Sequence, residues 1–90
     1  MAKSFTWEFN PKAEKSFEKL DSPIRKRIIR WLDTNVYGSE NPRLFGGALE
    51  GKYENLWKYR VGKYRIIADI KDDVFKVLVI KAGKRGDVYR

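Results

Sequence analysis

The chain contains neither cysteine nor histidine among its 90 residues. The lack of cysteine excludes a disulfide framework and a thiolate metal site. The lack of histidine removes the usual zinc ligand and the commonest general base near neutral pH. Glycine-rich phosphate-binding motifs are also missing. We therefore expect neither a metal site nor a cofactor.

Long hydrophobic runs are missing as well. No apolar stretch approaches the roughly 20 residues that a membrane-spanning helix needs. Residues 1–4 lead directly into a mixed strand rather than the apolar core of a signal peptide. We therefore expect a cytoplasmic protein without a membrane partner. A hydrophobic content of 42% and thirteen aromatic residues favour one folded domain that comprises residues 1–90.

Positive charge is abundant and unevenly distributed. The net charge is +8; residues 58–90 carry ten Lys or Arg and four Asp, a net of +6, whereas residues 1–57 carry a net of +2. Such an excess favours an anionic partner, with nucleic acid as the leading candidate. The alternative is a basic surface that serves only solubility.

The first half of the chain predicts one strand and two helices. Residues 5–9 alternate apolar and polar side chains, as a half-buried strand does. Asn10 and Pro11 begin a helix as N-cap and first helical residue. Ser22 is the expected N-cap of a second helix, and Gly38 its expected end. The apolar faces of the two helices contain Ala13, Phe17 and Leu20, and then Ile24, Ile28, Trp31 and Leu32.

The second half predicts three strands after an irregular connection over residues 38–52. The strands span about residues 53–61, 64–70 and 74–82, with short connections suited to antiparallel hairpins. Leu44, Phe45 and Leu49 are expected to pin the irregular connection to the core. The predicted order is β-α-α-β-β-β, an α+β domain in which a two-helix hairpin packs on one face of a small, mainly antiparallel sheet. The other sheet face is left for a partner.

The hairpin over residues 56–67 is unusually basic. Its polar positions are almost all cations: Lys58, Arg60, Lys63 and Arg65. Alternation places Lys58 and Arg60 on one face of their strand and Trp57 and Tyr59, interpreted as core residues, on the other. If the strand register sets Arg65 on the same face as Lys58, the two cations face one space, which Lys84, Arg85 and Tyr89 can close from the C-terminal end. Asp69 is a possible ion-pair partner.

Such a set suits the cleavage of RNA through its own 2′-hydroxyl group. This reaction needs a base, an acid for the leaving 5′-oxygen, and cations for the crowded phosphate. Arginine offers a planar fork for phosphate oxygens, and lysine can take part in acid–base chemistry when neighbouring cations depress its pKa. The scheme requires no metal. Taken singly, each cation is equally consistent with a solvated strand residue.

The sequence resembles the RelE toxins of the RelE/ParE superfamily, the toxin halves of bacterial toxin–antitoxin pairs. The resemblance covers nearly the whole chain. Its most specific segments are residues 56–65 (LWKYRVGKYR), 83–85 (GKR) and 88–90 (VYR), supported by residues 5–11, 41–42 and 46–49.

The resemblance implies an mRNA endonuclease that acts in the ribosomal A site. It implies that Lys58 serves in acid–base chemistry and phosphate contact, that Arg65 and Arg85 stabilise the transition state, and that Tyr89 orients the substrate nucleotide. Lys52, Arg60, Lys63 and Lys84 are the expected additional RNA-binding residues. The best-studied family members carry a second lysine where this chain has Leu56, and a longer spacing between the residues matching Arg85 and Tyr89.

The implied partners are a RelB-type antitoxin, in a toxin–antitoxin hetero-oligomer, and mRNA on the ribosome with contacts to 16S rRNA. Two other functions remain open from the sequence. The ParE branch shares the fold and the hairpin and inhibits DNA gyrase without cutting RNA, although it usually lacks the basic and tyrosine end segment. A basic RNA- or protein-binding module without activity is the third reading.

Overall fold

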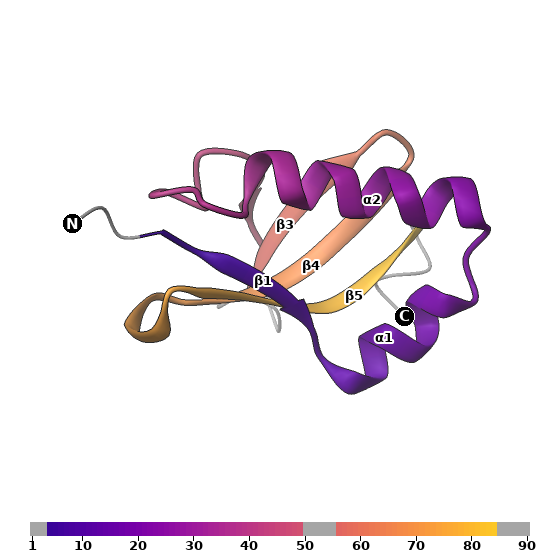
Figure 1. The fold of residues 1–90 in the computed structure, drawn as a ribbon, viewed down its shortest axis with the longest axis horizontal. Coiled ribbons are helices and arrows are strands. Elements are labelled where there is room, and N and C mark those ends of the chain that lie inside the picture. The colour runs from indigo at the N-terminus through magenta and orange to yellow at the C-terminus, as the bar shows by residue number, and fades with distance from the viewer. Residues whose placement is uncertain (1–3, 50–55, 85–90) are drawn as a thin grey trace.

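The computed structural model describes residues 4–49 and 56–84, which form two helices packed on one five-stranded sheet (Figure 1). The strand order is β1-β5-β4-β3-β2, with β1 parallel to β5 and the other neighbours antiparallel. The predicted α+β fold is confirmed. The elements are β1 (Thr6–Phe9), α1 (Pro11–Glu18), α2 (Ser22–Asn35), β2 (Gly47–Ala48), β3 (Trp57–Val61), β4 (Tyr64–Lys71), the 3-10 helix η2 (Asp72–Val74) and β5 (Lys76–Lys84).

The strand β1 and the helix α1 follow the predicted pattern. The side chain of Asn10 accepts a hydrogen bond from the backbone N–H of Lys12 at 2.8 Å, and Pro11 opens the helix. Ala13 and Phe17 are buried, and the Phe17 ring lies 4.6 Å from that of Phe9. This contact fastens α1 to the sheet face that carries the core.

The helix α2 begins one residue earlier than the sequence indicated. The prediction that Ser22 is the N-cap is wrong. Asp21 is the N-cap, in an extended conformation, and Ser22 is already helical. The reason is that the Asp21 carbonyl accepts hydrogen bonds from the N–H groups of Ile24 and Arg25, both at 3.0 Å. At the other end the helix stops at Asn35, and Gly38, with φ +79°, turns the chain toward Phe5.

The hairpin of β3 and β4 has the predicted two-residue turn. Gly62 adopts a φ of +61° and Lys63 does not have a positive φ, which matches a type II′ turn with glycine at its first central position. The register pairs Val61 with Tyr64 and Arg60 with Arg65. The predicted start of β3 near residue 53 lies outside the described residues.

The connection from β4 to β5 differs from the prediction. Val74, expected to begin the last strand, lies in η2 and is 59% exposed, and β5 begins at Lys76. The break occurs at Phe75, which has a φ of +52°, an unfavourable value for an aromatic residue. The Phe75 ring packs edge-on against Phe5 at 5.5 Å, and this tertiary contact holds it in place.

The core lies between the helices and one sheet face. Its largest fully buried side chains include Tyr59, Ile28, Leu32 and Ile66. The prediction that Leu44, Phe45 and Leu49 anchor the connection after α2 in the core is only partly right. Leu44 is 70% exposed and Phe45 is also exposed, whereas Leu49 is half-buried. Pro42 is the buried residue of this connection.

Replacing Gly46 by alanine is expected to destabilise the protein by about 2–4 kcal/mol. Gly46 has a φ of +83°, and a Cβ atom there would lie 2.0 Å from the carbonyl oxygen of Lys58 and 2.9 Å from Nε1 of Trp57. Urea unfolding measures the change. Gly47→Ala is the matched control, because a Cβ at that position meets open space. Equal effects of the two substitutions would contradict the close approach.

Candidate functional site

The strand register places four cations together on the sheet face away from the helices. Lys58 of β3 pairs with Ile67 of β4, which pairs with Lys81 of β5. In the next row toward the hairpin turn, Arg60 pairs with Arg65. Because paired residues share a face of the sheet, Lys58, Arg60, Arg65 and Lys81 form one group, here called the strand-face cluster.

Arg65 is the buried member of this cluster, at 7% exposure. Its guanidinium group donates one long hydrogen bond of 3.3 Å to the carbonyl of Tyr64, and it forms no ion pair with the described residues. Arg60 lies directly opposite. Like charges in directly opposed positions destabilise a sheet, and an unneutralised buried cation is costly. An anion bound at this face would remove both costs.

The ion pairs among the described residues lie at the other end of the sheet. Glu8 pairs with Lys76 at 2.6 Å, Asp69 with Lys71 at 2.9 Å, and Asp72 with Arg43 at 2.8 Å. Asp69 therefore neutralises a neighbour on its own strand and not Lys58 or Arg65. None of these three carboxylates pairs with Lys58, Arg60 or Arg65.

The remaining predicted site residues are distributed differently. Lys63 lies exposed in the hairpin turn. Lys84 pairs with Tyr64, which puts it on the helix-side face, away from the strand-face cluster. Lys52, Arg85 and Tyr89 lie outside the described residues. The structure thus brings together Lys58, Arg60 and Arg65 and sets Lys84 apart.

Sequence reasoning missed Lys81. Simple alternation along β5 from Leu78 puts Ile80 on the cluster's face and Lys81 on the opposite one. A β-bulge changes this: Ala68 pairs with Val79 and Ile67 with Lys81, so that Ile80 is the extra residue. No turn residue marks the bulge in the sequence.

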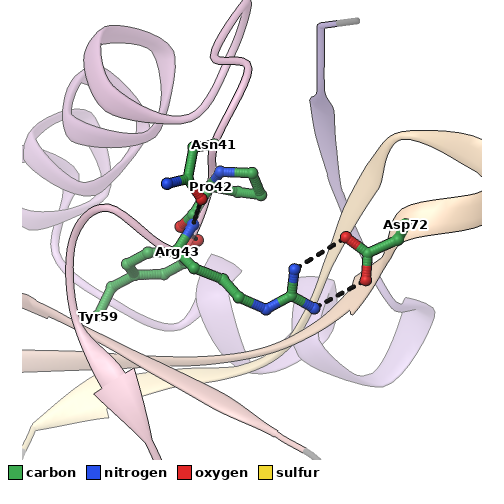
Figure 2. Close-up of polar contacts among 5 residues, drawn as sticks. All are labelled: Asn41, Pro42, Arg43, Tyr59 and Asp72. Carbon is green, nitrogen blue, oxygen red and sulfur yellow. Dashed lines mark hydrogen bonds and ion pairs between the residues drawn. The ribbon is translucent and has the colours of Figure 1, made fainter.

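A group of polar contacts lies on the other side of β3 from the cluster, and Figure 2 shows the residues around Arg43 and Tyr59. The buried hydroxyl of Tyr59 donates a hydrogen bond to the carbonyl of Pro42. Next to it, Arg43 forms a bidentate pair with Asp72, both bonds being 2.8 Å (Figure 2). Nε1 of Trp57 donates to the carbonyl of Phe45 at 2.7 Å. These contacts tie the connection after α2 to β3 and to the end of β4.

The same contacts decide the roles of the aromatic residues in β3. Tyr59 is fully buried and Trp57 is half-buried, both packed in the core. The interpretation of these two as core residues is confirmed. Because their side chains are held on the helix side, Lys58 and Arg60 are directed to the opposite face.

Stability is expected to fall when the pH rises from 10 to 12. Burial raises the pKa of Tyr59 to about 12 from the ordinary value of 10.0, and nearby Arg43 opposes part of this rise. Below pH 10 both states keep the phenol proton, so the full stability is present; between the two pKa values only the unfolded state loses it. The loss reaches about 2–3 kcal/mol.

Urea unfolding across this pH range measures that loss. Tyr59→Phe is the control, because residue 59 then cannot ionise and the curve reports the lysines and the other tyrosines, which titrate in the same range. A wild-type curve parallel to that of Tyr59→Phe would contradict the prediction.

Two further observations concern the described residues. No three acidic side chains lie close enough together to hold a metal ion in this part of the chain. Among residues 4–49 and 56–84, no helix is long and apolar enough to cross a membrane.

Comparison with known proteins identifies the family. The sequence model of the family described as "ParE toxin of type II toxin-antitoxin system, parDE" matches residues 7–89. This chain belongs to that toxin family. It is thus a toxin of the RelE/ParE superfamily, as the sequence resemblance indicated. Among curated proteins, no sequence matches the chain.

Solved structures of RelE toxins share the toxin's fold. The isolated RelE toxin of E. coli is 28% identical with a TM-score of 0.72, over 96% of this chain and 92% of that one. The toxin–antitoxin complex RelBE2 of Mycobacterium tuberculosis gives 23% identity and a TM-score of 0.78, over 93% and 94% of the chains. The archaeal RelE–RelB complex of Pyrococcus horikoshii is 21% identical with a TM-score of 0.69, and the match covers 92% of this chain and 97% of that one.

Proposed function

We propose that this toxin is an endoribonuclease that cleaves mRNA in the ribosomal A site by attack of the RNA 2′-hydroxyl on the adjacent phosphate. The observation that carries the proposal is the strand-face cluster. Lys58, Arg60 and Arg65 share one face, Arg60 and Arg65 are directly opposed, and none of the three has an ion-pair partner among the described residues. A phosphodiester supplies the missing negative charge.

Four side chains are proposed to share the steps of RNA cleavage. Arg65, buried and fixed in the sheet, donates its fork to the phosphate oxygens as negative charge develops. Lys58 lies in the adjacent row and contacts the phosphate or moves a proton. The 2′-hydroxyl gives up its proton as its oxygen attacks phosphorus, the bond to the 5′-oxygen breaks, and that oxygen takes up a proton. The products are a 2′,3′-cyclic phosphate and a free 5′-hydroxyl, with no net change in protons. Arg85 and Tyr89 are proposed to complete the site, with charge stabilisation by Arg85 and nucleotide orientation by Tyr89.

The partners follow from the same proposal. Solved relatives are RelE toxins in complexes with RelB antitoxins. We propose a RelB-type antitoxin for this chain too, whose acidic side chains cover the strand-face cluster and so block RNA. Contacts to 16S rRNA are proposed to hold the toxin in the A site.

The direct test incubates the purified toxin with ribosomes that carry a defined mRNA and maps the new 5′ ends. Cuts confined to the A-site codon support the proposal. Lys26→Ala is a suitable control, because Lys26 is an exposed cation of α2 that belongs neither to the strand-face cluster nor to the contacts behind it. Intact mRNA with a folded toxin on correctly programmed ribosomes rejects it.

A second candidate is inhibition of DNA gyrase without RNA cleavage, as in the ParE branch. It is favoured by the family whose sequence model matches the chain. A supercoiling assay with purified gyrase separates the two functions: inhibited supercoiling with intact mRNA supports the second.

A further inference from the structure

A groove lies between α2 and the tip of the β3–β4 hairpin, outside the proposed cleavage site. It has a volume of about 330 Å³, and its lining includes Arg27 and Arg30 of α2, Arg60 of β3, Trp31 and Gly62. Arg27 and Arg30 are three residues apart, a spacing that places two helical side chains on one side of the helix. Both are exposed.

Three arginines line the groove, and no counter-charge lies beside them among the described residues. Among the described residues that line the groove there is no carboxylate, and within residues 4–49 and 56–84 none of the three forms an ion pair. Three cations gathered around one depression repel one another, and a bound anion relieves that repulsion. The groove therefore has the electrostatic character of an anion site.

One of the three guanidinium groups lies against the hairpin turn. A Cβ atom on Gly62 would lie 2.7 Å from Nη2, 3.0 Å from Cζ and 3.2 Å from Nη1 of Arg27. The flat guanidinium group of Arg27 thus lies against the glycine backbone, where no side chain intervenes. A cation ordered before binding loses less conformational entropy when a ligand arrives.

Arg60 connects this groove with the strand-face cluster. It lines the groove from β3 and pairs with Arg65 in β4. The edge strand β2 pairs only with Trp57 and Lys58, so it does not cover β3 beside Arg60. A continuous series of cations therefore runs from α2 around the edge of β3 to Arg65.

We propose that this groove binds backbone phosphates of RNA and guides the strand toward Arg65. That the bound polyanion is RNA rests on the proposed function. Arginine forks match phosphate oxygens in pairs. The Trp31 ring already packs against the rings of Phe45, at 6.0 Å, and Tyr59, at 5.0 Å, so the groove presents cations rather than a free aromatic ring.

The test measures binding of a fluorescent 2′-O-methyl RNA 12-mer, which has no free 2′-hydroxyl and cannot be cut by the proposed reaction. The double variant Arg27→Ala/Arg30→Ala is expected to bind on the order of tenfold more weakly. Its slope of log affinity against log salt should be smaller by about 1.4, the value for two lost phosphate contacts on a single strand. Lys26→Ala is the control, an exposed cation of α2 outside the groove lining.

The outcomes separate this inference from the proposed function. If RNA affinity and salt slope are unchanged in the folded double variant, the groove does not bind RNA, whether or not the toxin cuts mRNA. If the double variant loses RNA affinity and the wild-type toxin leaves mRNA intact on programmed ribosomes, the groove is supported and the nuclease is rejected. A polyglutamate peptide that binds in an Arg27- and Arg30-dependent manner, while RNA affinity is unchanged, assigns the groove to an acidic protein and also overturns the inference. Thermal unfolding of each variant verifies its fold.

Discussion

Substitution of Arg65 by alanine is expected to lower the rate of mRNA cleavage by about 10²–10³-fold, the usual cost of removing one preorganised donor from a developing anion. Arg65 is the buried cation of the strand-face cluster, and its single hydrogen bond among the described residues is long. Its guanidinium group therefore has further donors that no described residue uses and that a phosphate can accept. The loss is expected mainly in kcat, because the interaction strengthens as charge develops.

The same substitution is expected to change the free energy of unfolding by only about 1 kcal/mol or less, because relief of the repulsion from Arg60 offsets the lost contacts of the aliphatic stem. Single-turnover cleavage on programmed ribosomes, with urea unfolding beside it, measures both quantities. Arg65→Lys keeps the charge without the fork and should fall between wild type and alanine. A folded Arg65→Ala toxin that cuts mRNA at the wild-type rate would remove Arg65 from the site.

Substitution of Tyr59 by alanine is expected to cost about 3–5 kcal/mol of stability, as for other large buried aromatic residues. Tyr59 is completely buried, its ring packs against Trp31 at 5.0 Å, and its hydroxyl donates to the carbonyl of Pro42. For a small domain with a total stability of about 5–15 kcal/mol, this loss is a large fraction of the whole.

Tyr59→Phe separates the ring from the hydroxyl. It should cost about 1–3 kcal/mol, because the Pro42 carbonyl loses its donor while the packing stays. Urea unfolding of both variants gives the two values, and Tyr37→Ala, at an exposed tyrosine, should stay within about 0.5 kcal/mol of wild type. Tyr59→Phe should cleave mRNA as wild type does, because its hydroxyl faces away from the strand-face cluster. A large loss of cleavage in folded Tyr59→Phe would place the hydroxyl in the chemistry instead.

The sequence predicted most of the fold because its local signals agree with the tertiary structure. Asn10 and Pro11 begin α1, and Gly62 marks the hairpin turn. Predictions failed where a backbone hydrogen bond or a side-chain contact overrode the local preference. Ser22 lost the N-cap position to Asp21, whose carbonyl accepts the first helical hydrogen bonds. Phe75 interrupts an apolar run because its ring packs on Phe5.

By itself the sequence determined that this is a small basic α+β toxin domain with Lys58 and Arg60 on one strand face, because alternation along a short strand needs no knowledge of its neighbours. Only the tertiary structure decided which other cations join them. The register brings Arg65 opposite Arg60, and the bulge near Ile80 moves Lys81 onto the same face. Packing of α2 against the hairpin turn adds Arg27, which lies against Gly62. These placements depend on hydrogen bonds and contacts between segments far apart in the chain, which no local pattern records.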